Sequence, residues 1–360
     1  MSSRPVRLAQ HSAVSTELAL LSDEQLRSSL EAAVPLGRGI GGTVAQLDVA
    51  GVRVFAKRVR LTALERLPEN ARSTANLFGL PMFYQYGVGS SGFGAWRELA
   101  AQLMTTTWVL TGEADGFPLL HHWRVLTEDA AAPPTRQEQD EIDFLVAHWE
   151  GAPAVRTRLE ALQGSTASVV LFLEHIPYRL GDWLPPRLAE GGEAAAAAFA
   201  MVERELTTAV DTMNSRGLQH FDAHFHNVLT DGQQIYLADF GLALSDRFDL
   251  TGAEADFLRR HRSYDSSYVA ARLLNALVSI EETGDQEALV REYGAGGNPG
   301  RLPEPLRATA QRLAPVGLAT GGFYRSLRQD SRDTPYPSAA IERACAEAGL
   351  AAYATAVPAG

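Results

Sequence analysis

The segment 220–241 constrains the fold more than any other part of the sequence. It reads His-Phe-Asp-Ala-His-Phe-His-Asn, a short apolar run, Asp231-Gly232, a second apolar run and Ala-Asp-Phe-Gly. An Asp-Gly pair between apolar runs is a strong signal for a β-hairpin, so we expect strands at 228–229 and 235–237. The segment therefore places polar side chains on both sides of a short hairpin.

The apolar patterns before and after this segment differ. Residues 34–59 alternate apolar and polar side chains around a turn at 50–51, which is typical of two or three antiparallel strands. Further strands are expected at 117–126 and 169–173, and helices at 95–110, 193–216, 265–283, 303–313 and 337–352. The expected fold class is α+β, with a small β-rich lobe followed by a larger, mainly helical lobe.

The expected organisation has three parts. They are an N-terminal helical extension at 1–33, a β-rich lobe at 34–176 with insertions at 61–94 and 128–165, and a helical lobe at 177–360. Ser22 and Gln25 have the spacing of a capping box in the extension. The first insertion is rich in glycine and aromatic residues, and the second is expected to hold one or two surface helices. Either insertion contacts a substrate or partner, or it only packs on the small lobe.

An excess of acidic residues narrows the range of partners. The chain carries 43 Asp and Glu against 32 Lys and Arg, a formal net charge of −11. It has no overall attraction for phosphate backbones, so no nucleic acid partner is expected. The N-terminus lacks a basic start followed by an apolar core, and the Ala-rich run 194–202 is too short to span a bilayer. We therefore expect a cytoplasmic protein with no membrane partner.

A glycine-rich segment lies among the first expected strands. It reads Gly37-Arg-Gly39-Ile-Gly-Gly42-Thr-Val44. Glycines let the backbone approach phosphates closely and direct N–H groups at them. Dinucleotide sites use a similar spacing, but there the glycines open a helix, whereas here another strand follows. A glycine-rich hairpin without a ligand is the alternative.

Single residues of the later motifs suit a metal–phosphate centre. Asp222 and Asn227 are five residues apart, a spacing that can place a carboxylate and an amide oxygen around one metal ion. Asp239 follows an apolar strand and precedes Phe-Gly, so its carboxylate is expected at a strand end. Lys57 alternates with apolar residues, and taken alone this pattern favours an exposed strand lysine.

Three histidines at 220, 224 and 226 also suggest zinc. The zinc-hydrolase pattern of two histidines on one helix face with a glutamate between them is absent, which disfavours metal ligation by these side chains. The single cysteine, Cys345, excludes a cysteine-based structural zinc site and an internal disulfide.

Taken in order, these motifs resemble the protein-kinase-like superfamily over about residues 34–285. The resemblance implies a bilobal kinase-like fold that binds ATP and Mg²⁺. It also implies that Gly37, Gly39, Gly42 and Val44 cover the ATP phosphates, and that Lys57 pairs with the α- and β-phosphates.

The resemblance assigns catalytic roles in the same way. Asp222 would orient the acceptor hydroxyl and take its proton, and Asn227 and Asp239 would hold Mg²⁺ between the β- and γ-phosphates. His224 is counted with the catalytic residues because it stands two residues after Asp222, where protein kinases usually carry lysine. Glu98 is the expected partner of Lys57, chosen over the nearer Glu65.

Two further assignments follow from the resemblance. Glu174-His175-Ile176 follows the apolar strand at the place of the hinge that binds adenine through backbone groups, so Glu174 and Ile176 are expected to contact the cofactor. Asp265 opens a helix, where it either braces the catalytic loop by accepting backbone N–H bonds or is a plain helix N-cap.

The resemblance implies transfer to a hydroxyl group, and three functions remain open. The glycine-rich segment and the Asp239 motif favour a Ser/Thr protein kinase that acts on a protein or peptide. His224 and the lack of an Ala-Pro-Glu motif after Gly241 are similar to aminoglycoside-type phosphotransferases, which act on small molecules. A catalytically inactive pseudokinase scaffold is the third, disfavoured because Lys57, Asp222 and the metal-binding side chains are all present. Phe221 replaces the arginine through which activation-loop phosphorylation usually acts.

Overall fold

The computed structural model describes residues 3–39, 42–87, 89–128, 135–279 and 285–350 of the chain. The chain divides into two compact units. The first unit comprises residues 1–176 and 239–255, and the second comprises 177–238 and 256–360. The part of the predicted helix 265–283 at 280–283 and the C-terminal residues 351–360 lie outside the described residues.

The first unit is built on a five-stranded antiparallel sheet with the order β1-β2-β3-β5-β4. Its elements are α1 (Arg4–Leu20), α2 (Asp23–Glu31), β1 (Val34–Gly39), β2 (Gly42–Val49), β3 (Val52–Arg60), the 3₁₀ turns η1 (Pro68–Asn70) and η2 (Met82–Gln85), α3 (Ala95–Thr111), β4 (Leu120–Thr127), α4 (Arg136–His148), α5 (Pro153–Gln163), β5 (Ala167–Glu174) and β10 (Leu244–Ser245). The strands expected at 34–59, 117–126 and 169–173 are therefore present.

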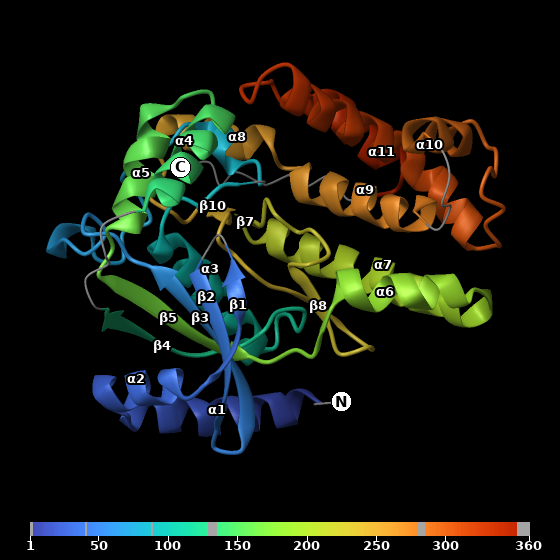
Figure 1. Cartoon of the computed structure of the whole chain (residues 1–360). Coiled ribbons are helices and arrows are strands. Elements are labelled where there is room, and N and C mark those ends of the chain that lie inside the picture. Colours follow the sequence, from blue (N-terminus) through green and yellow to red (C-terminus); the bar gives the residue numbers. More distant parts are fainter. Residues whose placement is uncertain (1–2, 40–41, 88, 129–134, 280–284, 351–360) are drawn as a thin grey trace, which may run out of the picture. The chain divides into compact units, whose positions relative to one another are not determined.

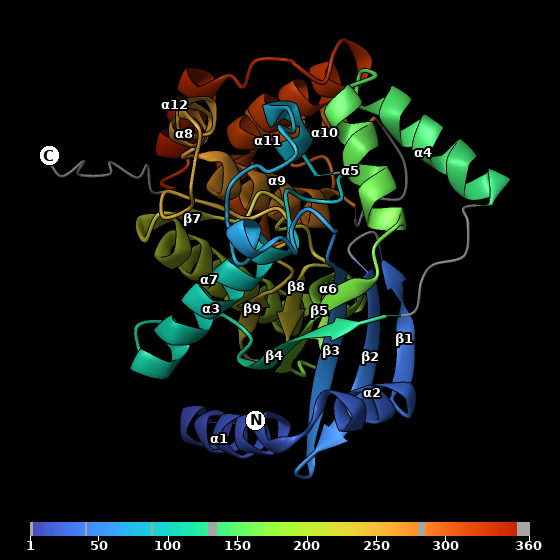
Figure 2. The same ribbon diagram turned by 90° about the vertical axis from the view of Figure 1, so that its left-hand side faces the viewer.

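The sheet is covered on both faces by helices. Alternate residues of a strand point to opposite faces, so Val170 and Phe172 of β5 pack against α1 and α2, whereas Val169 and Leu171 pack against α3. Both ribbon views show α1 and α2 beside the sheet (Figures 1 and 2). The N-terminal extension is thus part of the core of the first unit rather than an appendage.

The two insertions pack on each other. Tyr84 and Phe93 of the first insertion form a cluster with Val146, Trp149 and Val155 of the second, and all five side chains are buried. The rings of Tyr84 and Trp149 meet edge to face with centroids 4.8 Å apart. The second insertion holds the two helices expected there, α4 and α5.

The second unit is mainly helical. Its elements are β6 (Tyr178–Arg179), α6 (Leu180–Glu190), α7 (Gly192–Ser215), β7 (Leu218–Gln219), β8 (Val228–Thr230), β9 (Ile235–Leu237), α9 (Tyr264–Val278), α10 (Gln286–Gly294), α11 (Leu306–Gln329) and α12 (Ser338–Glu347), with the last five residues of α8 (Gly252–Arg260). The core helix α9 packs against α7, α11 and α12. The hairpin expected around Asp231-Gly232 is formed by β8 and β9.

Three features differ from the sequence pattern. The pattern does not indicate α6, α8 or α10. The helix expected at 303–313 extends to Gln329, because Leu313, Ala314 and Val316 are buried and their packing outweighs the hydrogen bond that Pro315 cannot donate. Residues 239–255, expected in the helical lobe, group with the first unit.

Among the residues described, no helix combines the length and the apolar character needed to cross a membrane.

We expect α1 to contribute strongly to the stability of the first unit. Leu18 is fully buried against the sheet, so Leu18→Ala should lower the free energy of unfolding by about 2–5 kcal/mol. Leu20 lies on the same helix with 79% of its surface exposed, and Leu20→Ala serves as the matched control. Urea-induced unfolding measures both, and equal stability of the two variants would show that α1 does not share the core.

A buried histidine pair makes the stability of the first unit depend on pH. His11 of α1 and His121 of β4 approach to 3.1 Å between their Nδ1 atoms. Burial, followed by His11 and Arg7, lowers the pKa of His121 to about 3. The unfolded chain binds this proton near pH 6.5 and the folded chain does not. The contribution of His121 to the free energy of unfolding is therefore complete above that pH and is lost as the pH falls.

His121→Gln should weaken this dependence. Between pH 6.5 and 4.5 the wild-type free energy of unfolding should fall more steeply than that of the variant, by about 1.4 kcal/mol per pH unit. Urea titrations at several pH values measure the two slopes. Parallel slopes would mean that His121 titrates normally in the folded protein.

Candidate functional site

Lys57 lies at the centre of a buried charge cluster in the first unit. Its Nζ atom is 2.7 Å from Glu98 Oε1 and 2.8 Å from Asp239 Oδ1. Lys57 shares its face of β3 with Val59, which packs against α3, and α3 carries Glu98. The Lys57–Glu98 ion pair expected from the sequence is therefore present. Glu65, the alternative partner, instead pairs with Arg158 at 2.8 Å.

The cluster keeps Lys57 positively charged. Burial alone would lower the pKa of Lys57, but the carboxylates of Asp239 and Glu98 outweigh it and raise the pKa above its ordinary value. Burial raises the pKa of Glu98, and the Lys57 ammonium opposes this shift. Asp239 is the most accessible member, with 43% of its side chain exposed. The cluster thus offers a fixed cation and one accessible carboxylate.

The backbone around Asp239 is closely packed. Asp239 has a φ of 62°, in the left-handed region, and its Oδ1 atom accepts a hydrogen bond from Gly241 N at 3.3 Å. A Cβ atom at Gly241 would lie 3.3 Å from that oxygen and 3.6 Å from Glu98 Oε2. A larger residue than glycine would therefore crowd the Asp239 carboxylate and come into contact with that of Glu98.

The glycine-rich segment forms the hairpin of β1 and β2. Gly37 pairs with Val44 and Gly39 pairs with Gly42, while Ile40 and Gly41 at the tip lie outside the described residues. Gly42 has a φ of 137°, and a Cβ atom there would be 1.7 Å from Arg58 O. Glycine at this position is thus required by packing against β3.

Gly37 differs from Gly42 in its surroundings. It has a φ of 135°, but a Cβ atom there would meet nothing within 4 Å. Val44 pairs with Lys57 across β2 and β3, so the two side chains share one face of the sheet. Gly37 pairs with Val44, and Val44 pairs with Lys57, so these three residues lie side by side across β1, β2 and β3.

Glu174 is held by an arginine that the sequence analysis did not identify. Arg7 of α1 makes two 2.8 Å hydrogen bonds to the Glu174 carboxylate and a 2.7 Å bond to Phe117 O. Arg7, His11, Val14 and Leu18 follow a helical spacing along one face of α1, which could have indicated that Arg7 is buried. The side chain of Glu174 thus has a structural role, and Ile176 follows it, half-buried.

In the second unit, the loop between β7 and β8 brings Asp222 and Asn227 together. Asn227 Nδ2 donates to Asp222 Oδ2 and to its backbone carbonyl, both at 3.0 Å. His220 Nε2 donates to Ala238 O at 2.9 Å, so its Nδ1 atom accepts from Asp222 N at 3.3 Å. His224 Nε2 lies 3.7 Å from Asp222 Oδ2. The loop conformation is therefore fixed by its own side chains.

Asp265 braces this loop from α9. Its two carboxylate oxygens accept hydrogen bonds from His220 N at 2.7 Å and Phe221 N at 2.9 Å. With its amide nitrogen toward Asp265, Asn214 donates a third bond of 2.9 Å. Burial raises the pKa of Asp265 to about 6, and the backbone donors oppose this shift. Of the two roles considered for Asp265, bracing the loop is the one observed.

Phe221 is an apolar anchor rather than a surface side chain. It has a φ of 62°, an unusual conformation for an aromatic residue, and only 1% of its surface is exposed. Its ring packs on Tyr264, with centroids 4.8 Å apart, and on Phe257 at 5.6 Å. Phe221 thus fixes the loop by packing.

The donor atoms suit Mg²⁺ better than zinc. Asn227 uses its amide nitrogen toward Asp222, so its amide oxygen is the atom that would ligate a cation, and Asp239 offers a partly exposed carboxylate. Oxygen ligands of this kind are those that Mg²⁺ prefers. In the described ranges, no three His, Cys, Asp or Glu side chains are grouped so that they could hold a metal ion. Asn227 belongs to the second unit and Asp239 to the first.

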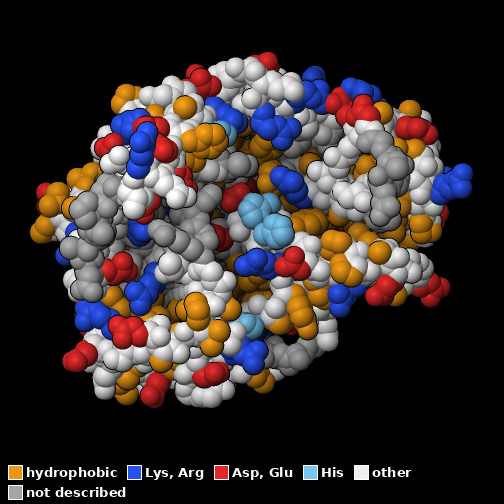
Figure 3. Space-filling model, in the orientation of Figure 1, with side chains coloured by type: hydrophobic (Ala, Val, Ile, Leu, Met, Phe, Trp, Pro, Cys, Tyr) orange, Lys and Arg blue, Asp and Glu red, His pale blue; other side chains and the backbone are white. Residues whose placement is uncertain are grey.

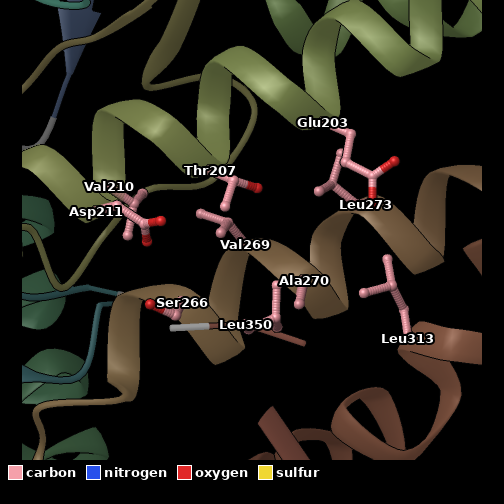
Figure 4. A pocket seen from close by; sticks show the side chains of 10 residues that line it. All are labelled: Glu203, Thr207, Val210, Asp211, Ser266, Val269, Ala270, Leu273, Leu313 and Leu350. Carbon is pink, nitrogen blue, oxygen red and sulfur yellow. The ribbon is translucent and has the colours of Figure 1, made fainter. Parts of the chain in front are cut away.

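The second unit holds a small pocket. It is lined by polar and apolar side chains of α7 and α9, together with Leu313 and Leu350 (Figure 4). The Oγ atom of Ser266 at its wall is buried and has no hydrogen-bond partner among the described residues. None of the residues predicted for the site lines this pocket.

A scan against protein-family models and a search of the curated proteins found no match to this chain.

Breaking the charge cluster should destabilise the first unit. Lys57→Met leaves the buried Glu98 carboxylate without its cation, and we expect a loss of about 3–5 kcal/mol in the free energy of unfolding. Lys57→Met combined with Glu98→Gln should recover part of this loss, since the buried charge is then removed. Urea-induced unfolding provides the comparison. A double variant less stable than Lys57→Met would contradict the assigned pairing.

Proposed function

We propose that the protein is an ATP-dependent kinase that transfers the γ-phosphoryl group of ATP to a hydroxyl. One observation carries the proposal: Lys57 Nζ bridges Glu98 and Asp239 at 2.7 and 2.8 Å. A strand lysine paired with a helix glutamate, beside the Asp of an Asp-Phe-Gly motif, is the arrangement that protein kinases use to hold ATP phosphates.

The buried cluster suits this role on physical grounds. Phosphoryl transfer needs positioning and charge neutralisation more than covalent chemistry. In the proposed reaction, Lys57 stays protonated and pairs with the α- and β-phosphates, while Glu98 fixes its ammonium. Asp239 and Asn227 would hold Mg²⁺, which would supply neutralisation of the phosphate charge. Gly37, Gly39 and Gly42 leave backbone N–H groups near the phosphates.

Asp222 acts on the acceptor in this proposal. Its carboxylate orients the attacking hydroxyl and takes the proton, and Asn227 Nδ2 holds one of its oxygens at 3.0 Å. His220 and Asp265 fix the backbone of the loop on either side. The buried Lys57 cluster and the intact loop argue against a pseudokinase scaffold, which has no need of these side chains.

The acceptor that we propose first is a Ser or Thr of a protein or peptide. A small-molecule phosphotransferase is the second candidate, favoured by His224, whose Nε2 atom lies 3.7 Å from Asp222 Oδ2 where protein kinases usually carry lysine. Lys and Arg side chains are interspersed with Asp and Glu on the face shown in Figure 3. Nucleic acid therefore remains outside the proposed acceptors.

Asp222→Asn tests the proposed function. Loss of the general base should lower the rate of phosphoryl transfer by about a hundredfold or more while the fold is retained. Asp256→Asn, which alters a carboxylate 51% exposed on α8, is the matched control and should keep full activity. The assay follows ATP consumption with Mg²⁺ and separates labelled polypeptides from labelled metabolites.

Each outcome of this assay has a meaning. Label on Ser or Thr supports the protein acceptor, and label confined to hydroxylated metabolites supports the second candidate. If Asp222→Asn turns over ATP as fast as the wild type, or if the wild type neither binds nor consumes ATP, the kinase assignment is wrong.

A further inference from the structure

The segment 239–255, which begins with Asp239 and follows the Asp-Phe-Gly motif, is tied down along its length within the first unit. Its last anchor is Glu254, whose carboxylate lies 2.6 Å from Arg97 Nη2 of α3. Only 2% of the Arg97 side chain and none of the Glu254 side chain is exposed. An ion pair buried this deeply holds only if both partners stay in place, since either charge alone is costly.

Arg97 makes further contacts that fix its direction. Its Nε atom donates to Thr74 O at 2.7 Å, and its guanidinium lies over the rings of Phe93 and Phe248, 5.1 and 5.8 Å from their centroids. Phe248 is itself part of the segment 239–255. Arg97 therefore joins α3, the first insertion and this segment at one point.

Three more contacts from the first insertion reach the same segment. Asp249 N donates to Thr74 Oγ1 at 2.8 Å, and Gln85 Nε2 donates to Leu242 O. A Cβ atom at Gly92 would lie 2.4 Å from Gly241 O, so the two backbones are in close contact. The glycine- and aromatic-rich insertion thus packs directly against the segment 239–255.

Arg97 and Glu98 are neighbours on α3 but point to different partners. Successive residues of an α-helix are rotated by about 100°, so Glu98 can pair with Lys57 while Arg97 pairs with Glu254. The helix thereby couples the two ends of the segment: Asp239 through Lys57 and Glu98, and Glu254 through Arg97.

We propose that Arg97 is a positioning residue, which, through its buried ion pair with Glu254, holds the segment 239–255 in the one conformation that places Asp239 beside Lys57. This inference rests on the proposed kinase function. Glu254 supplies a permanent carboxylate to the arginine, so the segment is ordered without a phosphate group. Its two hydroxyl side chains agree with this: Ser245 is fully buried, and Thr251 Oγ1 bonds Glu254 Oε2 at 3.0 Å.

The test compares hydrogen exchange and kinetics in the full-length chain. The main variant combines Arg97→Met with Glu254→Gln, which removes both charges and leaves neither one buried alone. Amides of 239–255 should exchange at least tenfold faster than in the wild type, while those of β5 stay protected. We expect kcat to fall at least tenfold, with KM for ATP changing less than threefold.

Arg158→Met is the matched control. It breaks an equally buried ion pair of the same unit, with Glu65, at side-chain exposures of 2% and 1%. Glu65 keeps its bonds from Thr62 and Ala95, and among the described residues neither Glu65 nor Arg158 forms a hydrogen bond or ion pair with the segment 239–255. This variant should leave both the exchange of the segment and kcat unchanged.

A milder variant keeps the proposal testable if the main variant does not fold. Arg97→Lys keeps the charge but loses the bond to Thr74 O, and its segment should exchange at an intermediate rate; unchanged exchange in the folded Lys variant would overturn the proposal. Phosphatase treatment of the wild type should leave kcat unchanged, and a loss of activity would show that a phosphate group is needed.

The exchange measurement separates this inference from the proposed function, since it is made without ATP. If the wild type transfers no phosphoryl group, the kinase assignment fails. The exchange rates still test whether the Arg97–Glu254 ion pair holds the segment 239–255. If the segment exchanges faster in the main variant while kcat stays at the wild-type value, the ion pair holds the segment but Arg97 is not a positioning residue.

Discussion

The ammonium group of Lys57 between two carboxylates is the interaction on which the first unit depends. A lysine with 8% of its side chain exposed remains charged only where its lost hydration is replaced, and Glu98 and Asp239 replace it. This requirement fixes three things at once: the face of β3 on which Lys57 lies, the rotation of α3 about its axis, and the path of the chain at Asp239. Asp239 has a left-handed backbone, a conformation that aspartate adopts more readily than most residues.

Buried arginine–carboxylate pairs extend the same principle through the first unit. Arg7–Glu174, Arg97–Glu254 and Arg158–Glu65 each join parts of the chain far apart in the sequence, and each arginine side chain is 2% exposed. Pairs of this kind contribute little net stability compared with apolar residues, but a wrong arrangement leaves a charge buried and unpaired. They therefore select one arrangement of the extension, the insertions and the segment 239–255.

Local patterns explain why part of this structure could be predicted from the sequence. Two of the correct predictions rest on short stretches of sequence: the strand alternation around residues 34–59 and the Asp-Gly turn of β8 and β9. The prediction of Lys57 and Glu98 rests on the known order of motifs. Long-range pairing of single charges leaves no such pattern. Arg97 lies in a helix that is buried almost all round, so nothing in its neighbourhood marks it as the partner of Glu254.

The grouping of 239–255 with the first unit could not be predicted for a related reason. The sequence places these residues after a strand of the helical part, and only their contacts with Thr74, Gln85 and Arg97 show where they pack. Likewise, Pro315 suggests a helix end, although burial of its neighbours carries α11 through it. In both cases tertiary packing outweighs a local signal.

The motifs also differ in how strongly they argue for function once the packing is known. Gly42 and Gly92 would be required by close backbone contacts in any protein with this fold, so they say little about a ligand. Gly37 has open space around it, and its φ of 135° has no packing cause of that kind. Lys57 carries more weight, because an apolar residue on the same face of β3 would be buried without the cost of desolvating the charges of Lys57 and Glu98. Because a cluster of buried charges contributes little net stability, the Lys57 cluster and the loop braced by Asp265 are the features on which the proposed phosphoryl transfer rests.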